Sequence, residues 1–455
     1  MSHAPRERGR GRRRHRSRRE RGIALVIAMT AIAILAVMLA DMHENTTSAY
    51  VVATTERDQL RAEYMAKSGL NLTRLLIAQE PAIRTLVAPL YQAVIQRPPP
   101  MLPVWSFADA VLRPFCDYSS MEEMGLTNSV GVDFVTAEGL GDTGGTCEVL
   151  GVAENSKINI SDPLSADGDR AATSVAMQMF ALMGGYQSPS PYDPLFEGRD
   201  IDGNFTSRLD IVSALIDWWD FDAERTTFDP GAGRVTRGGV EDDVYRMFDD
   251  SYQARNAPFD SIEEMRLVRG IGDDFWATFV EPDPEDPRSR SITIYGSGAV
   301  NPNEAEPAVL IARICSIIGT TQPLCGDPIE AAKFIQLLRT IRMIAPIPFF
   351  TRGADFITFL EGRGGPQDLY PMLQAFPGAE ALLFMPVVIT PEQRTQLDGA
   401  LVTAARILTI QSTGRAGRAT VRIRTVMNFH DRWTPPPPNA GTMPGLGIYY
   451  YYRVD

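Results

Sequence analysis

The pattern of apolar and polar residues divides the first 80 positions into three zones. A basic segment ends at Arg21, and an uncharged apolar run extends from Gly22 to Ala40. From residue 54 to residue 80, apolar residues recur at close to helical spacing among charged ones, which is typical of an amphipathic helix. No proline follows until Pro81, so residues 23–80 are predicted to form one helix about 87 Å long at 1.5 Å per residue. The apolar positions of its second half are Leu60, Tyr64, Leu72, Leu75, Leu76 and Ile77.

The apolar run, residues 23–40, has the length and composition of a membrane span. About 20 apolar residues cross the hydrocarbon core of a bilayer, and a basic N-terminal flank places that end in the cytoplasm. A cleaved secretory signal would have a shorter apolar region, of about 7–15 residues, before a small-residue cleavage site. Polar sequence of helical character follows Asp41 instead. A plain signal anchor is the alternative that the length alone also fits.

The junction between the basic and apolar zones carries a more specific signal. A basic leader that ends in Gly22 and is followed at once by the apolar Ile23 resembles the class III signal of type IV pilins and pseudopilins. The resemblance implies that a prepilin peptidase cleaves between these two residues and methylates the new N-terminus. Most pilins have glutamate at the fifth mature position, which is Ile27 in this chain. Because an unpaired carboxylate in lipid is costly, its absence favours a tip or first subunit, with no other subunit above it.

The distribution of charge argues against nucleic acid as a partner. Residues 1–22 hold ten arginines and two glutamates, so with a formal net charge of −12 the rest of the chain carries about −20. So acidic a body matches divalent cations better than nucleic acid. The arginine tract resembles a nucleic-acid-binding arm, but next to an apolar run we interpret it as a topogenic flank.

Four cysteines follow the apolar run, and none of them forms a C-x-x-C pair, so a zinc site is not expected. If the body lies outside the cytoplasm, disulfides can form. Cys315 and Cys325, on either side of a turn, are the first predicted pair, and Cys116 with Cys147 then follows by default. Four reduced, buried thiols are the alternative.

Short strand patterns flank a helical middle at residues 165–290. A proline-rich connection lies near residue 100, and residues 414–417 are suited to a hairpin turn. Strands at both ends of the chain around a helical middle are what an insertion into one sheet domain produces. The expected strands are 132–135, 147–152, 406–410, 419–427 and 447–453.

An acidic cluster is expected where a helix over residues 209–219 ends. Calcium takes six to eight oxygen ligands, many of them carboxylates, from glycine-rich loops of this kind. The spacing is not that of an EF-hand, so the pattern alone favours a solvated acidic helix end. The candidate ligands are Asp217, Asp220 and Asp222 at the helix end, and Glu241 and Asp242 after a glycine-rich loop.

Residues 258–276 are predicted to form a helix, a glycine turn and a second helix, with Ser261 and Glu264 in a capping box. The turn, Gly270–Gly272, resembles that of helix-hairpin-helix modules that bind DNA. A membrane-anchored DNA-binding or DNA-uptake protein is therefore the second hypothesis. Asp273, directly after the turn, would repel phosphate, which favours a packing role.

No catalytic site is predicted, so the chain is not expected to be an enzyme. Its four histidines lie far from any candidate nucleophile, and the sequence has no G-x-S-x-G, H-E-x-x-H or phosphate-loop motif.

Several segments follow one another in the order typical of one family. They are Met65–Leu70, Glu154–Ile160, Leu215–Asp220, Glu241–Tyr245, Ala257–Gly270 and Val300–Ala305. Together they resemble the type II secretion minor pseudopilin K, or general secretion pathway protein K, family, which also lacks the glutamate at the position of Ile27. The likeness covers about residues 22–304, while the long leader and residues 319–400 depart from it.

The resemblance implies an α+β pseudopilin fold, in which a long N-terminal helix packs on an antiparallel sheet. It also implies a large inserted all-helical domain with SAM-like, helix-hairpin-helix packing. Members of the family bind calcium in that domain, and the matching positions are Asp220, Asp222, Glu241 and Asp242. The expected division is a leader at 1–22, the long helix at 23–80, a first α/β part at 81–163, the helical insertion at 164–295 and the rest of the α/β domain at 296–455.

For function, the resemblance implies a minor pseudopilin that forms the pseudopilus tip with the I and J minor pseudopilins. It would initiate assembly and cap growth during protein export across the outer membrane. Other pseudopilins, the prepilin peptidase and the inner-membrane assembly platform are further expected partners, and nucleic acid is not. The chain would cross the bacterial inner membrane once, with its N-terminus cytoplasmic and its body periplasmic, before it moves to the tip.

Overall fold

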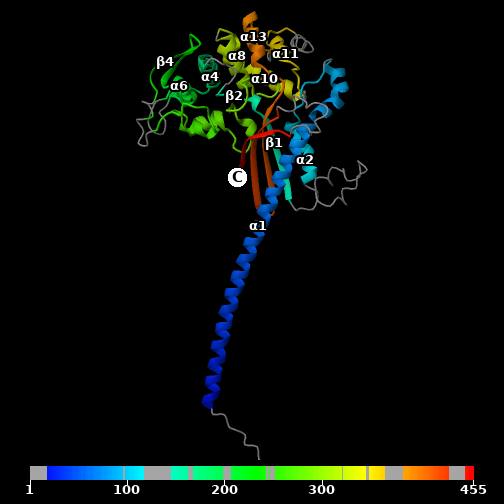
Figure 1. Cartoon of the computed structure of the whole chain (residues 1–455), viewed down its shortest axis with the longest axis vertical. Coiled ribbons are helices and arrows are strands. Elements are labelled where there is room, and N and C mark those ends of the chain that lie inside the picture. Colours follow the sequence, from blue (N-terminus) through cyan, green and yellow to red (C-terminus); the bar gives the residue numbers. More distant parts are fainter. Residues whose placement is uncertain are drawn as a thin grey trace, which may run out of the picture.

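One helix, α1 (Arg18–Ile95), forms the stalk of the molecule and continues into its body (Figure 1). The computed structural model describes residues 18–95, 98–116, 145–161, 168–197, 206–241, 245, 252–319, 321–344, 348–363, 383–429 and 446–455. The strand expected at residues 132–135 lies outside these ranges. The strands expected at 147–152 and near the C-terminus are present.

The stalk half of α1 is exposed, and its first part, residues 22–40, is apolar. Every residue from 22 to 53 is exposed, and Gly22–Ala93 contains, among the described residues, the one helix long and apolar enough to cross a membrane. The helix is also longer than predicted, because Pro81 and Pro89 lie inside it rather than ending it. Contacts with the body stabilise the helix beyond these prolines. There the buried Tyr91 hydroxyl donates a hydrogen bond to the carbonyl of Pro348 at 2.8 Å.

Where α1 packs on the sheet, its buried face begins with two alanines and continues with larger apolar residues. Ala62, Ala66 and Leu70 are buried there at four-residue spacing. The expectation that the large apolar residues form this face is wrong in part, since Leu60 is 55% exposed and Tyr64 is 60% exposed, whereas Ile77 is buried. Small side chains allow the helix to lie close against the sheet, and that close approach decides which face is buried.

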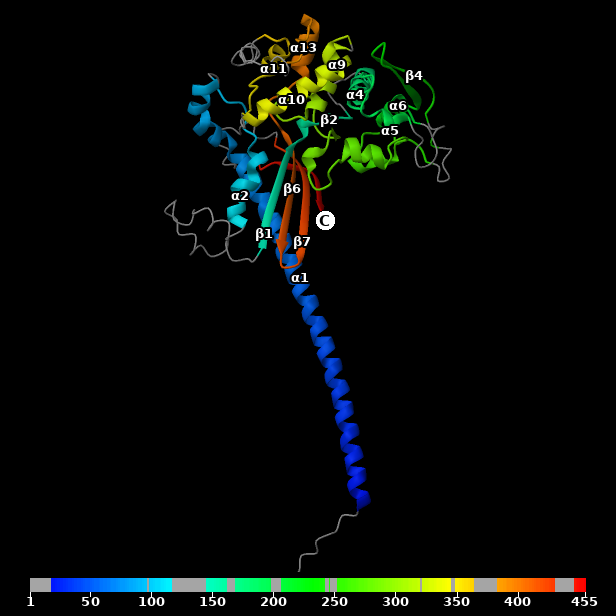
Figure 2. The same ribbon diagram turned by 180° about the vertical axis from the view of Figure 1, so that it is seen from behind.

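A four-stranded antiparallel sheet lies along the body half of α1, with strand order β1-β6-β7-β8. Its strands β1 and β6 pair over their whole lengths, although more than 250 residues separate them in the chain. The strands run beside the helix in Figure 2. The sheet consists of β1 (Gly145–Ala153), β6 (Ile407–Ala416), β7 (Ala419–Asn428) and β8 (Ile448–Val454).

The contact between α1 and β6 is unusually close. The Ser412 hydroxyl donates to the backbone oxygen of Ala66 at 2.8 Å. A Cβ atom placed on Gly414 would lie 2.0 Å from the backbone oxygen of Ala62. Position 414 therefore requires glycine, because any side chain there would collide with the backbone of α1.

On one side of the sheet, α1, η1 (Val104–Phe107) and α2 (Ala108–Cys116) complete the first hydrophobic core. The predicted fold class, α+β with a long N-terminal helix on an antiparallel sheet, is confirmed. The β6–β7 connection is a tight hairpin in which Gly417 has a φ of +55°.

All other elements belong to the chain between β1 and β6, and they gather at the end of the body away from the stalk (Figure 2). One hydrophobic core runs through them from Ile158 to Leu401. Helices after residue 296 share that core, so the helical part is larger than the predicted 164–295. The elements are η2 (Glu154–Ser156), β2 (Ile158–Asn159), α4 (Gly168–Leu182), α5 (Asp193–Glu197), α6 (Arg208–Trp219), β3 (Glu224–Asp229), β4 (Arg234–Val240), η4 (Ile262–Leu267), α7 (Asp273–Phe275), η5 (Trp276–Val280), η6 (Pro287–Ser289), β5 (Ile292–Thr293), α8 (Pro307–Ile318), α9 (Pro323–Gly326), α10 (Pro328–Ile344), α11 (Gly353–Leu360) and α13 (Pro391–Ala400).

The glycine turn at 270–272 packs inside the helical part. A Cβ atom on Gly270, whose φ is +85°, would lie 2.4 Å from Cγ2 of Thr206 and 2.7 Å from Cγ1 of Ile211. The predicted capping box is wrong, because the Ser261 side chain makes no capping hydrogen bond and Glu264 binds Arg255 instead. The element before the turn is accordingly a short 3₁₀ helix.

A buried ion pair joins the sheet to the helical part. The Lys157 ammonium donates to Glu154 at 2.7 Å, and both side chains are 3% exposed. The hydroxyls of Thr293 on β5 and Thr409 on β6 donate to the same carboxylate. Burial alone would raise the pKa of Glu154, but Lys157 and the two hydroxyls hold it below its usual range.

Replacing Gly414 by alanine is expected to force α1 away from β6 and to destabilise the chain by about 1–3 kcal/mol, the usual cost of overpacking. Thermal unfolding of the full-length protein in detergent micelles measures the effect. Gly399→Ala is the matched control, because a Cβ atom there meets nothing within 4 Å. Equal melting temperatures for the two variants would contradict the close contact.

Candidate functional site

The predicted processing residues lie at the start of α1. Gly22 and Ile23 stand in the exposed, apolar part of the helix. Ile27 is 62% exposed and places no charge on this part of the stalk. The geometry therefore presents an apolar helix to its surroundings directly after the glycine.

The acidic cluster forms where α6 ends and where the β3–β4 hairpin returns. Asp220 caps α6, Asp222 follows it, and Glu241 comes directly after β4. One carboxylate oxygen from each of these three residues lies within 4.8 Å of the others. The structure thus brings together three of the five candidate ligands.

Of the other two candidates, Asp217 does not belong to this group. Asp217 accepts a hydrogen bond from the backbone N–H of Thr226 at 2.7 Å, which ties α6 to β3. Burial raises the pKa of Asp217 to about 7, although the bond to Thr226 acts in the opposite direction. Asp217 thus has a structural partner of its own, and Asp242 lies outside the described residues.

An arginine that the sequence did not single out lies among these carboxylates. Arg237 of β4 donates to Asp220 at 2.8 Å and forms an ion pair with Asp222. Its Nε donates to Asp169, at the start of α4, at 2.9 Å. Arg237 and its partners lie on different elements that are far apart in the chain, so no short sequence motif indicates these ion pairs.

The cluster fits a calcium ion in the chemistry of its donors. Calcium prefers carboxylate oxygens, and the three acidic residues supply up to six. Asp220 is buried, and its Oδ1 accepts no hydrogen bond from the described residues. Burial raises the pKa of Asp220, while Arg237 opposes that shift. A metal ion would satisfy the remaining oxygen, with Asp220, Asp222 and Glu241 as its protein ligands.

The cysteines lie in both parts of the body. Cys315 of α8 and Cys325 of α9 form a disulfide with a Cα–Cα distance of 5.6 Å. Cys147 of β1 is also disulfide-bonded. The side chain of Cys116 lies outside the described residues, so the Cys116–Cys147 pairing stays a prediction.

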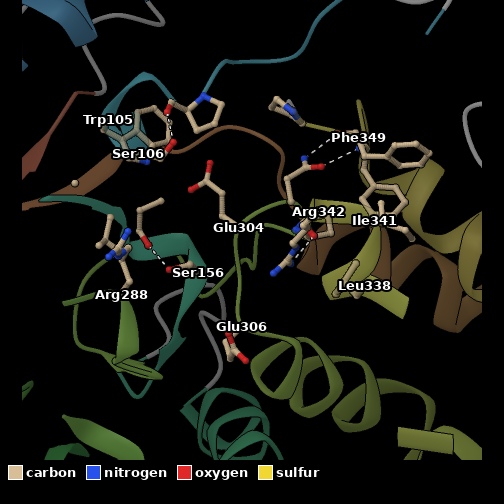
Figure 3. A pocket seen from close by; sticks show the side chains of 18 of the residues that line it. Trp105, Ser106, Ser156, Arg288, Glu304, Glu306, Leu338, Ile341, Arg342 and Phe349 are labelled. Atoms are coloured by element: carbon tan, nitrogen blue, oxygen red, sulfur yellow. Dashed lines mark hydrogen bonds between the residues drawn. The ribbon is translucent and has the colours of Figure 1, made fainter. Parts of the chain in front are cut away.

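A cavity of about 310 Å³ opens between the two cores, and sequence analysis did not predict it. The turn at residues 300–305, noted above only as a family landmark, lines one side. Asn303 fixes this turn by exchanging hydrogen bonds with the backbone of Phe350. Figure 3 shows Glu304 between Trp105 on one side and Arg342 on the other.

Glu304 is a titratable group of this cavity with a raised pKa. Burial raises its pKa to about 7, against the opposing effects of the Arg342 guanidinium and of a hydrogen bond from the Trp105 side chain. This pKa places the loss of the proton from Glu304 near neutral pH.

Comparison with known proteins gives one similar structure to report. A chain of the GspK–GspI–GspJ complex from the type 2 secretion system of enterotoxigenic Escherichia coli is similar over 69% of this chain and 80% of that chain. The sequence identity is 13% and the TM-score is 0.36. No protein-family model matches the chain, and no curated protein matches it in sequence. At this level of likeness, function has to be inferred from the residues of this chain.

The raised pKa of Glu304 predicts a pH-dependent stability. Between its ordinary pKa of 4.5 and about 7, the folded chain keeps a proton that the unfolded chain has lost. The free energy of unfolding therefore falls as the pH rises through this window. Glu304→Gln cannot ionise, so it should match the wild type near pH 4.5 and exceed it at pH 8 by about 1–3 kcal/mol, at about 1.4 kcal/mol per pKa unit.

Thermal unfolding followed by tryptophan fluorescence across this pH range measures the difference. Glu306→Gln, on the rim of the same cavity, is the control and should gain no stability at pH 8. A Glu304→Gln variant that is no more stable than the wild type at pH 8 would show that the carboxylate is solvated.

Proposed function

We propose that the chain is a non-enzymatic minor pseudopilin of the K type in a type II secretion system. The observation that carries the proposal is the construction of α1 and the sheet. One continuous helix is exposed over residues 22–53 and apolar over residues 22–40, and it then packs on an antiparallel sheet through a face that includes Ala62 and Ala66. This is the construction that a filament subunit needs, because the same helix must lie in lipid before assembly and among other helices afterwards.

The helical part supports a place at the end of the filament. It is inserted between β1 and β6 and lies at the end of the body away from the stalk (Figure 1). A subunit in the middle of a filament needs room for a neighbour there. A large second core in that position would instead cap growth, and the uncharged Ile27 suits a subunit that has no terminal amine above it to neutralise.

The exposed side chains of α1 support helical partners. Leu60, Tyr64 and Leu75 are large, apolar and exposed on the half of α1 that packs on the sheet. In a filament they would be covered by the helices of other subunits. We infer that the I and J minor pseudopilins, and other pseudopilins below them, are those partners, and that the prepilin peptidase and the inner-membrane assembly platform act on the chain before assembly.

The remaining features fit a body in the periplasm. The Cys315–Cys325 disulfide forms in an oxidising compartment. We infer one inner-membrane span with the basic N-terminus in the cytoplasm, and a structural calcium ion at Asp220, Asp222 and Glu241.

The proposal predicts a processed N-terminus. Intact-mass analysis of the protein extracted from membranes should show a chain that begins at N-methylated Ile23 only when a prepilin peptidase is present. Gly22→Leu should block this cleavage, because the resemblance places the cut directly after the glycine. Gly11→Leu, a glycine within the leader, should be cleaved as the wild type is.

Two results would contradict the proposal. A chain that starts at Met1 with active peptidase present would be a basic-flanked signal anchor. Cleavage beyond Ala40 would release a secreted protein with no filament helix.

A further inference from the structure

Arg237 occupies the acidic cluster as a cation. Its Nη1 lies 2.8 Å from Asp220 and also contacts Asp222, while its Nε donates to Asp169 at 2.9 Å. Two of these three carboxylates are the residues that would bind calcium. A guanidinium and a metal ion are thus alternative counter-ions for the same oxygen atoms.

The arginine does not satisfy the cluster completely. The Asp220 side chain is 7% exposed, and Arg237 bonds to its Oδ2. Its Oδ1 is also buried and accepts no hydrogen bond from the described residues. A calcium ion with six to eight oxygen ligands would use both oxygens, which a guanidinium held from one side does not.

The two cations cannot occupy the cluster together. At a separation of about 4 Å in a partly buried site, like charges repel strongly, because the effective dielectric constant there is far below that of water. The guanidinium has another carboxylate to which it can hold. Asp169 already accepts from Nε, and its side chain is 70% exposed, so Arg237 can keep this bond while its Nη1 leaves the cluster.

We propose that Arg237 is the internal counter-ion of the metal-free cluster and that calcium binds only by displacing its guanidinium from Asp220 and Asp222. Arg237 thereby sets the calcium affinity of the site. The inference rests on the proposed calcium site, and it adds a residue of opposite charge that the ligand set alone would not suggest.

The hairpin that carries Arg237 can stay in place during this exchange. Arg237 pairs in register with Thr226 of β3, and the backbone N–H of Thr226 is held by Asp217. The contact between Asp217 and Thr226 lies outside the cluster of carboxylates. Displacement therefore requires movement of one side chain and leaves the fold of the hairpin unchanged.

Isothermal titration with calcium chloride tests the inference on the full-length chain in detergent micelles. Arg237→Gln removes the competing charge, so it should bind calcium about tenfold tighter or more, the scale expected for losing charge-assisted hydrogen bonds. Its melting temperature in a chelator should fall, and the gain in melting temperature on adding calcium should be larger than in the wild type.

Three further variants separate charge from folding. Arg237→Lys keeps the positive charge and should bind calcium about as weakly as the wild type. Arg234→Gln removes the same charge from an exposed position of β4 and should leave the affinity unchanged. Glu241→Ala should abolish binding in both the wild-type and the Arg237→Gln backgrounds.

Equal calcium affinity in the wild type and in Arg237→Gln would overturn the inference, as would binding that survives Glu241→Ala. Absence of binding in both the wild type and Arg237→Gln would remove the calcium site and the inference together. The pseudopilin proposal would survive that result, because N-terminal processing tests it separately.

Discussion

The two cores of this protein depend on a carboxylate that neither could keep buried alone. Glu154 lies where β1 ends, and Lys157 returns to it within one turn at 2.7 Å. Thr293, within the insertion, and Thr409, on β6 after it, add hydroxyl donors. Removing one partner from a buried ion pair costs several kilocalories per mole, because the other charge stays in a poor solvent. The pair therefore fixes where the helical part leaves the sheet and where it rejoins it.

Contact with neighbouring elements also explains which residues occur along α1. A membrane span needs large apolar residues on all sides, but a helix that lies close to a sheet needs small ones on a single side. The chain has both in sequence, with an exposed apolar run over residues 22–40 and, further along the helix, a face that includes Ala62 and Ala66. Gly414 supplies the matching recess in the sheet. Under the proposed function, one unbroken helix would pass from lipid into a protein assembly without refolding.

The sequence predicted those features that repeat over many residues. The apolar span, the strand alternation of β7 and the helical middle all follow from periodicity. The buried face of α1 did not, because periodicity favoured Leu60 and Tyr64 while the close approach of the sheet selected alanines. The extent of the helical part was underestimated for a related reason: α8 to α13 join its core through contacts far apart in the chain.

Some residues of the candidate site could likewise be predicted from the sequence, and others could not. Asp220, Asp222 and Glu241 could be proposed because they cluster in two short segments around a hairpin. Arg237 could not, since its role arises only when β4 folds back beside α6 and α4. In the sequence, Glu304 belonged only to a segment that resembles the family, and nothing indicated a cavity there. The cavity is formed by residues of both cores. Long-range packing, rather than local pattern, decides which charged residues meet.

The proposed function assigns mechanical work to these features. In that function the helix would connect the subunit to a filament, and the second core would supply bulk at the opposite end. Assembly and capping would require no catalytic groups. They would require one surface that binds the neighbouring subunits and another that prevents further subunits from adding.

The position of the chain on an assembled pseudopilus tests this account most directly. An affinity tag at the C-terminus, labelled with gold particles, would be located by electron microscopy on filaments assembled with the I and J minor pseudopilins. The account predicts a single particle at one end of each filament. Particles distributed along the filament length would contradict it, because a repeating subunit could not carry the helical part where its neighbour must sit.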